Sequence, residues 1–280
     1  MLKWKKVLTL ILALLLLTVC AAAETQVSAL FINVGKADAA ILFLGDQRVL
    51  VDSGTKNNHD HLMRVLDAYG IRHFDAVIVT HTDKDHAGGL NKMYKAGITT
   101  DMMYAGELHS EKSLDDHRVY EASVKYDVPL SWLKAGDVLQ MGECTLQILG
   151  PLSQDPEKEN NNSLVIRLVT PEGDMLLTGD MELEEEAELM QAGLISQAPV
   201  LKVSHHGEDD ATSRSFAMLV RPQWAVISTS SEEEPDTPDD KVIARLTGVG
   251  SSIAQTQSAE VGIQVTLTDG QAAAQLINWQ

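Results

Sequence analysis

The sequence has few cysteines, few basic residues and few long apolar runs, and each shortage narrows the possible classes of protein. Its 280 residues contain two cysteines and 22 Lys and Arg against 40 Asp and Glu, a net charge of −18. Proteins that coat nucleic acid have the opposite sign of charge, so that role is excluded. After Val19, no apolar run approaches the roughly 20 residues of a membrane-spanning helix. With 44% hydrophobic and 22% charged residues, the remainder has a globular composition.

The first 23 residues have the pattern of a secretory signal peptide. Lysines precede an apolar run over residues 7–19, and three alanines follow at 21–23. An uncleaved anchor and lipid attachment at Cys20 are the alternatives. Cleavage would change the net charge to −21 and leave Cys144 as the only cysteine, so no internal disulfide could form. We therefore expect a secreted or extracytoplasmic protein in which residues 24–280 form a single domain.

Short apolar runs rich in β-branched residues alternate with helical patterns along the rest of the chain, and no internal repeat is visible. The predicted strands are 27–33, 40–44, 48–52, 76–79, 138–141, 145–149, 164–169, 175–177, 200–203, 224–227, 262–267 and 274–277. The predicted helices are 59–69, 119–126, 181–192, 213–220 and 239–246. Because strands dominate both halves and each half contains helices, this order favours two sheets packed face to face with helices outside.

Histidine and aspartate gather directly after three of these strands. The segment 81–86 contains four metal-ligand side chains, those of His81, Asp83, Asp85 and His86. Asp180 follows the strand at 175–177, and His205 follows the strand at 200–203. A solvated loop, a turn-capping Asp180 or a buried His205 would each explain one segment alone. The three together indicate a metal site at the edges of the sheets.

The order of these segments resembles the metallo-β-lactamase superfamily, whose signature is His-x-His-x-Asp-His followed by a bridging Asp and a final His. It is more closely similar to the hydrolase domain of ComEC-type DNA-uptake proteins. The matching stretches are 31–35 with Asp38, 51–54, 80–90, 160–168, 176–180, 201–207 and 222–228. The resemblance implies an α/β fold of the metallo-β-lactamase type, a four-layer αβ/βα sandwich.

The resemblance also implies two adjacent divalent metal ions, Zn²⁺ or Mn²⁺. The first ion would be held by His81 and Asp83, and the second by Asp85, His86 and His205, with Asp180 bridging both. Asp83 replaces the usual second histidine, and the usual mid-chain histidine falls in the stretch 160–163. The first site is therefore rich in oxygen ligands, and we expect it to be weak or empty. Asp85 is the expected catalytic residue, because it would orient the metal-activated water.

Six further residues are expected around the ligands. Asp38 and Asp52 are candidates to hold metal-bound histidines. Turn capping is the alternative for Asp52, and a solvent-facing strand position is the alternative for Lys202. Lys202 and His206 flank the last ligand and could contact an anionic substrate. Asn160 and Ser163 lie in the stretch where the mid-chain histidine of the superfamily would fall.

The combined pattern predicts an exported metal-dependent hydrolase, a phosphodiesterase or nuclease that acts on a phosphate ester, with DNA outside the cell as the leading substrate. The alternatives are a small cell-wall phosphate ester, a lactone, or a non-catalytic metal-binding module. Glu208 replaces the usual Ser of ComEC-type domains, and Thr237 replaces a His. We expect the acidic run 208–210 to repel a polyanion. No stable protein partner is expected, and membrane contact would come only through a retained N-terminus.

Overall fold

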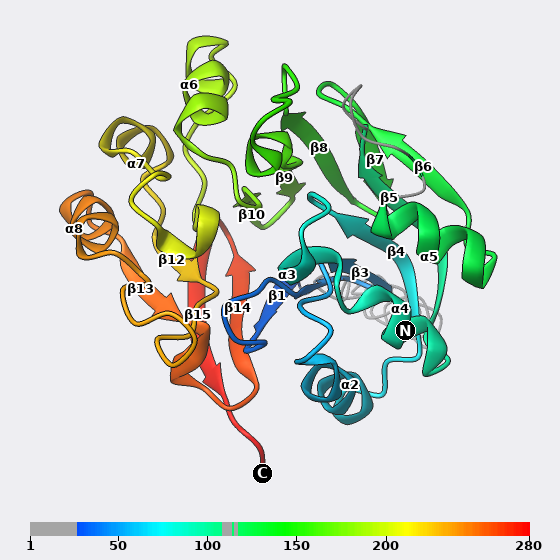
Figure 1. Cartoon of the computed structure of the whole chain (residues 1–280). Coiled ribbons are helices and arrows are strands. Elements are labelled where there is room, and N and C mark those ends of the chain that lie inside the picture. Colours follow the sequence, from blue (N-terminus) through cyan, green and yellow to red (C-terminus); the bar gives the residue numbers. More distant parts are fainter. Residues whose placement is uncertain (1–26, 108–113, 115–116) are drawn as a thin grey trace, which may run out of the picture.

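The structure, a computed structural model, describes residues 27–107, 114 and 117–280 and is shown in Figure 1. The expected signal peptide, residues 1–23, lies outside this part of the chain. No described helix combines the length and the apolar composition that a membrane span requires. The described chain forms two β-sheets with helices on their outer faces (Figure 1).

The first sheet has eight strands and brings the beginning and the end of the described chain together. Its order is β15-β14-β1-β2-β3-β4-β5-β6. Pairing is antiparallel from β15 to β3 and parallel from β3 to β6. The strands are β1 (Val27–Ile32), β2 (Ala40–Leu44), β3 (Gln47–Val51), β4 (His73–Val79), β5 (Thr99–Gly106), β6 (Leu130–Leu133), β14 (Gly262–Thr268) and β15 (Gln271–Ile277).

The second sheet has seven strands and the same division into two halves. Its order is β13-β12-β11-β10-β9-β8-β7. Pairing is parallel from β13 to β10 and antiparallel from β10 to β7. The strands are β7 (Val138–Met141), β8 (Cys144–Gly150), β9 (Val165–Thr170), β10 (Gly173–Leu177), β11 (Val200–Lys202), β12 (Trp224–Ile227) and β13 (Ser252–Gln255).

Three apolar clusters separate four layers. On β1, Val27, Ala29 and Phe31 face the second sheet, whereas Leu30 and Ile32 face helices. This alternation explains why the whole strand is buried. The helices that cover the first sheet are α2 (His59–Ala68), α4 (Leu90–Lys95) and α5 (Arg118–Tyr126), and those that cover the second are α6 (Leu183–Gln191), α7 (Arg214–Val220) and α8 (Asp240–Gly248). The predicted four-layer αβ/βα sandwich is confirmed.

The parallel half of each sheet positions the site. The loops that follow β3 and β4 in the first sheet, and β10 and β11 in the second, contain the predicted metal ligands together with Asp52 and His206. Parallel neighbours end at the same edge, and open α/β sheets bind ligands beyond the carboxyl ends of their strands. The two sheets therefore deliver side chains to one place from opposite sides.

Candidate metal centre

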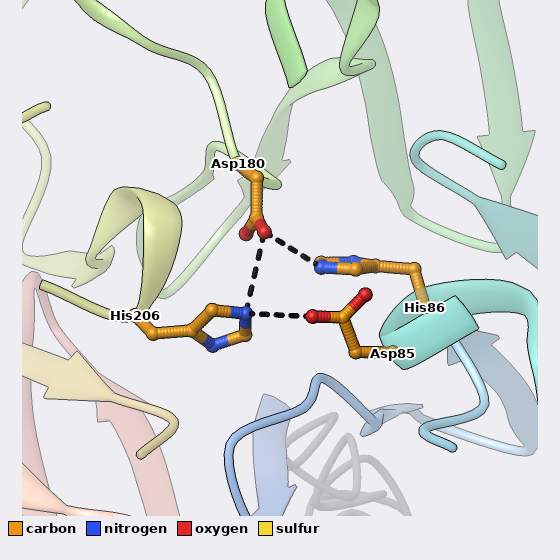
Figure 2. A group of neighbouring side chains, drawn as sticks. All are labelled: Asp85, His86, Asp180 and His206. Carbon is orange, nitrogen blue, oxygen red and sulfur yellow. Dashed lines mark ion pairs between the residues drawn. The ribbon is translucent and has the colours of Figure 1, made fainter. Parts of the chain in front are cut away.

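Four side chains from both sheets meet at this edge, as Figure 2 shows. Asp85 and His86 lie on the short helix α3 (Lys84–Ala87) after β4, Asp180 follows β10, and His206 lies in the 3₁₀ turn η3 (Ser204–Gly207) after β11. Asp180 Oδ2 lies 3.0 Å from His86 Nε2 and 3.2 Å from His206 Nε2. Asp85 Oδ2 lies 3.5 Å from His206 Nε2. One donor atom from each residue falls within 4.8 Å of all the others, a spacing at which one cation could bind all four.

Two glycines allow the loops to approach this closely. Gly89 follows α3, and a Cβ there would lie 2.1 Å from the carbonyl oxygen of Ser53. Gly179 precedes Asp180 with a φ of +52°, and a Cβ there would lie 2.9 Å from the side chain of Ser163. Larger residues would push apart the loops that carry the donors.

Asp52 fixes the orientation of His86. It follows β3, and Oδ2 lies 2.8 Å from His86 Nδ1. The same carboxylate accepts hydrogen bonds from the Thr80 amide and the Thr80 hydroxyl, each at 2.8 Å. A carboxylate behind the imidazole sets its tautomer and turns Nε2 toward the centre. Thr80 is a residue that the sequence analysis missed, although its place between a strand and His81 is a signal.

His206, and not His205, completes the four-residue group, which corrects the expectation from the sequence. His206 Nδ1 lies 2.9 Å from the carbonyl oxygen of Ser228, which turns Nε2 inward. His205 instead places Nδ1 2.8 Å from Asp210 Oδ1 and Nε2 3.2 Å from Asn160 Nδ2. The backbone of both histidines is in the left-handed region, with φ of 46° at His205 and 54° at His206. This backbone turn gives the two adjacent rings different partners.

The other two expected ligands, His81 and Asp83, lie next to this group but are not members of it. His81 Nε2 lies 4.0 Å from Asp83 Oδ2, and the Asp83 side chain is 48% exposed. The His81 ring is buried, with its centroid 4.1 Å from that of His86. Burial, followed by the charge of His86, lowers the pKa of His81 to about 3, so the ring is neutral. His81 and Asp83 thus offer fewer donors than the four-residue group, and the weaker first site stays a prediction.

The buried donors of the centre fit a cation. His81 Nε2, His86 Nε2, His206 Nε2 and Asp180 Oδ1 are buried, and none has a hydrogen-bond partner among the described residues. Buried polar atoms are nearly always satisfied, and leaving one unpaired costs about 1–3 kcal/mol. Imidazole nitrogens and carboxylate oxygens are ligands for borderline divalent metals such as Zn²⁺.

The charges of the four side chains also fit a divalent cation. Burial opposes charge on His206, but Asp180 and Asp85 outweigh it and raise the pKa of the imidazole to about 9. Burial also opposes charge on His86, but Asp180 and Asp52 raise its pKa well above the usual range. Without a cation, two protons on these rings offset the two carboxylates of the centre. A divalent cation has the same charge as the two protons that it would displace.

Lys202 and Asp38 form an ion pair beside the centre. Lys202 is buried at the end of β11, and its Nζ contacts Asp38 Oδ2 and lies 3.9 Å from Asp180 Oδ1. Burial would lower the pKa of Lys202, but the charges of Asp38 and Asp180 outweigh burial and raise it. The alternative of a solvent-facing lysine is therefore wrong, and the contact of Lys202 with substrate stays a prediction.

Asn160 and Ser163 both lie around the centre. Asn160 Nδ2 donates to Glu182 Oε1 at 3.0 Å in addition to its contact with His205. Ser163 Oγ accepts from the Asp180 amide at 3.0 Å and lies 3.4 Å from His81 Nδ1. These contacts position Asp180 and His81 and show how the mid-chain stretch, without a histidine, supports the site.

Each acid of the run 208–210 has a partner. Glu208 lies 2.9 Å from Lys36 Nζ, and Asp210 pairs with His205. Asp209 contacts both Lys241 and Arg245. The run therefore presents much less uncompensated negative charge than the sequence suggests, and the expected repulsion of a polyanion is correspondingly weaker.

Two sheets with helices outside and clustered His and Asp donors at their parallel ends define the metal-binding αβ/βα sandwich proteins. Residues 32–231 match the family model for the metallo-beta-lactamase superfamily, and the chain belongs to that superfamily. The metallo-beta-lactamase fold protein YhfI from Bacillus subtilis superposes with a TM-score of 0.58 at 13% identity, covering 87% of this chain and 100% of that protein.

The chain is also similar to curated competence proteins. It is 31% identical to ComE operon protein 3 of Bacillus subtilis over 251 residues, which cover 83% of this chain and 32% of the relative. It is 25% identical to Competence protein ComA of Neisseria gonorrhoeae over 237 residues, which cover 83% of this chain and 31% of that relative. The chain therefore spans under a third of the length of these relatives.

Proposed function

We infer that the protein is a metal-dependent hydrolase of phosphodiesters. The observation that carries this proposal is the convergence of Asp85, His86, Asp180 and His206 on one point, where the two histidines and Asp180 have buried donor atoms without a hydrogen-bond partner among the described residues. The superfamily match and the similarity to competence proteins support the same reaction class. When bound, a divalent cation supplies Lewis acidity and activates water for attack.

The chain contributes an ionised carboxylate, that of Asp85, which is placed to orient water. Asp85 is the most open of the four residues, with a side chain 24% exposed, whereas His86, Asp180 and His206 are covered. Burial would raise the pKa of Asp85, but contact with His206 and the charge of His86 lower it well below its usual range. The carboxylate is therefore ionised at neutral pH and can orient an attacking water.

A panel of substrates tests this proposal. Single-stranded DNA, a small chromogenic phosphodiester and a β-lactam are each assayed with Mn²⁺ or Zn²⁺. We expect hydrolysis of a phosphodiester that chelation abolishes and that Asp85→Asn reduces by at least about 100-fold. Asp46→Asn is the matched control, because Asp46 is exposed in the turn between β2 and β3 and is not an expected ligand. Activity that survives exhaustive chelation, or that both variants lose equally, would contradict the proposal.

The alternatives differ in substrate or in catalysis. Hydrolysis of the small diester without cleavage of DNA would favour a small cell-wall phosphate ester, and a chromogenic lactone added to the panel tests the lactone alternative. A non-catalytic metal-binding module would bind metal and hydrolyse nothing. We also propose an extracytoplasmic location, supported by the signal-peptide pattern of residues 1–23. Recovery of the chain from the cytosol with Met1 intact would contradict that location.

A further inference from the structure

A basic groove lies between α7 and α8, away from the candidate metal centre. Its volume is about 850 Å³, and its lining includes Arg214, Arg221, Lys241, Arg245 and Met218. The two helices contact each other and lie side by side at one end of the molecule (Figure 1). None of these residues belongs to the group that could hold a metal.

The charge of this groove is opposite to that of the chain as a whole. One residue in seven is acidic overall, yet 211–231 and 241–259 contain no Asp or Glu. These two stretches include α7, all of α8 after its first residue, Asp240, and all the side chains named in the groove. The positive charge is therefore concentrated by local sequence, in a protein whose net charge is −18.

Half of the basic side chains in the groove have no acidic partner. Lys241 and Arg245 share Asp209. Arg214 and Arg221 are exposed, and neither forms an ion pair with a described residue. Asp239 also acts on Lys241, so the uncompensated positive charge of the groove comes from Arg214 and Arg221. Met218, 56% exposed, adds an apolar surface to the same lining.

The dimensions suit a chain of phosphates. From Lys241 to Gly248 the groove follows α8 for about 10 Å, at about 1.5 Å per residue. Successive phosphates of one strand in a duplex are about 3.4 Å apart along the axis and those of an extended single strand are farther apart, so the groove has room for about two phosphates of a single strand. Guanidinium groups bind phosphate through paired N–H donors, which favours phosphate over a carboxylate polymer in a groove with three arginines.

The groove is connected to the loop that carries His206. Arg245 contacts Asp209 and donates to the carbonyl oxygen of Ala211 at 3.2 Å. The backbone amide of Asp239, which caps α8, donates to the carbonyl oxygen of Gly207 at 2.9 Å. A polymer seated along α8 would thus approach the segment that forms one wall of the centre.

We propose that this groove binds the backbone of a phosphodiester polymer, a stretch of the substrate outside the metal centre. The proposal rests on the proposed function for the identity of the polymer. It gives the protein a preference for chains over monomeric diesters. It also provides a local attraction for a polyanion on a protein of negative net charge.

Binding is tested with the full chain by fluorescence anisotropy, using labelled oligothymidylate and labelled poly(glycerol phosphate), with and without EDTA. R214E/R221E reverses the two unpaired groove cations. K95E/K134E is the matched control, because Lys95 and Lys134 are exposed, lie outside the groove and give the same change in net charge. We expect R214E/R221E to bind at least about ten-fold more weakly at 50 mM NaCl, and the control to change by less than about two-fold. A plot of the logarithm of the association constant against the logarithm of the salt concentration should be less steep in the groove variant. The magnitude of its slope should be smaller by about 1.4, or about 0.7 for each lost phosphate contact.

Each outcome decides the proposal. Binding of both polymers, or of either one, with selective loss in R214E/R221E supports it, and the preferred polymer identifies the source of the phosphates. Equal loss in both double variants, equal competition by polyglutamate, or no binding by the wild type at 50 mM NaCl overturns it.

Thermal melting checks that the variants fold, and the single variants R214E and R221E replace the pair if the double variant is unfolded. Hydrolysis of the small diester by wild type tests the metal centre separately, so either proposal can fail alone.

Discussion

The hydroxyl of Thr237 donates a 2.7 Å hydrogen bond to the carboxylate of Glu208. These are the two positions at which the sequence departs from the ComEC-type pattern, so the departures are in contact. Lys36 joins them, with Nζ 2.9 Å from Glu208 and a further contact to Glu234. The amide of Lys36 also donates to Glu233 at 3.2 Å. The altered positions therefore form one interacting group that engages a lysine near the site.

Releasing this lysine should strengthen the binding of anions. In Glu208→Ser, Lys36 loses one of its two carboxylate partners, and we expect a three- to ten-fold (order-of-magnitude) gain in affinity for oligothymidylate at low salt. Anisotropy titration measures the gain. Glu232→Ser is the control, because Glu232 is exposed and its replacement changes the net charge equally. An equal gain in both variants would assign the effect to net charge alone.

The two adjacent histidines should differ in their effect on metal binding. His206→Ala removes a member of the four-residue group, and we expect the affinity for Zn²⁺ or Mn²⁺ to fall by more than about 100-fold. His205→Ala removes a ring that contacts Asn160 and Asp210, and we expect a loss below about ten-fold. Calorimetric titration of both variants measures this difference. A larger loss for His205→Ala would restore the assignment made from sequence.

Asp52→Asn should weaken metal binding while leaving the backbone intact. Asp52 is left-handed, with a φ of 59°, a conformation that Asn tolerates well. The substitution removes the carboxylate behind His86. We expect about 10–100-fold weaker metal binding, the usual effect of losing a side chain that orients a metal-bound histidine. Asp46→Asn, in the exposed turn between β2 and β3, is the control and should bind metal normally. Unchanged affinity in Asp52→Asn would show that Thr80 alone suffices to hold His86.

Glu185 should make stability depend on pH. Its carboxylate is buried in α6 without a hydrogen-bond partner, and burial, followed by the charge of Glu188, raises its pKa well above 4.5. The folded state then holds a proton that the unfolded state releases, so this stabilising contribution is complete below pH 4.5 and is lost as pH rises through the folded-state pKa.

We therefore expect Glu185→Gln to raise the melting temperature at pH 8. The gain should be at least about 2–4 °C, the equivalent of roughly 1 kcal/mol. The difference from wild type should shrink as pH falls toward 4.5. Glu121→Gln, on the exposed face of α5, should show neither effect. A pH-independent gain would point to packing instead of ionisation.

Apolar runs were sufficient to predict most strands, and the parallel strand ends were sufficient to predict three of the four central residues. The sequence analysis missed β5, β6 and β13. β5 begins with the polar residues Thr99, Thr100 and Asp101, and β13 is a short, partly exposed edge strand, so neither has a strong apolar pattern. The choice between His205 and His206 depends on two consecutive left-handed residues and on the Ser228 carbonyl. No local pattern contains that information, because it arises from the packing of β11 against β12.

The pairing of β1 with β14 imposes an order on folding. Val27 lies opposite Leu267, so the first strand acquires its second neighbour only from the last hairpin. A nascent chain synthesised at about 5–20 residues per second cannot complete this sheet until nearly the whole sequence has emerged. A chain that stops before Gly262 would leave one edge of β1 unpaired, a template for joining other chains. The C-terminal hairpin thus protects the N-terminal strand against aggregation, far from the chemistry of the site.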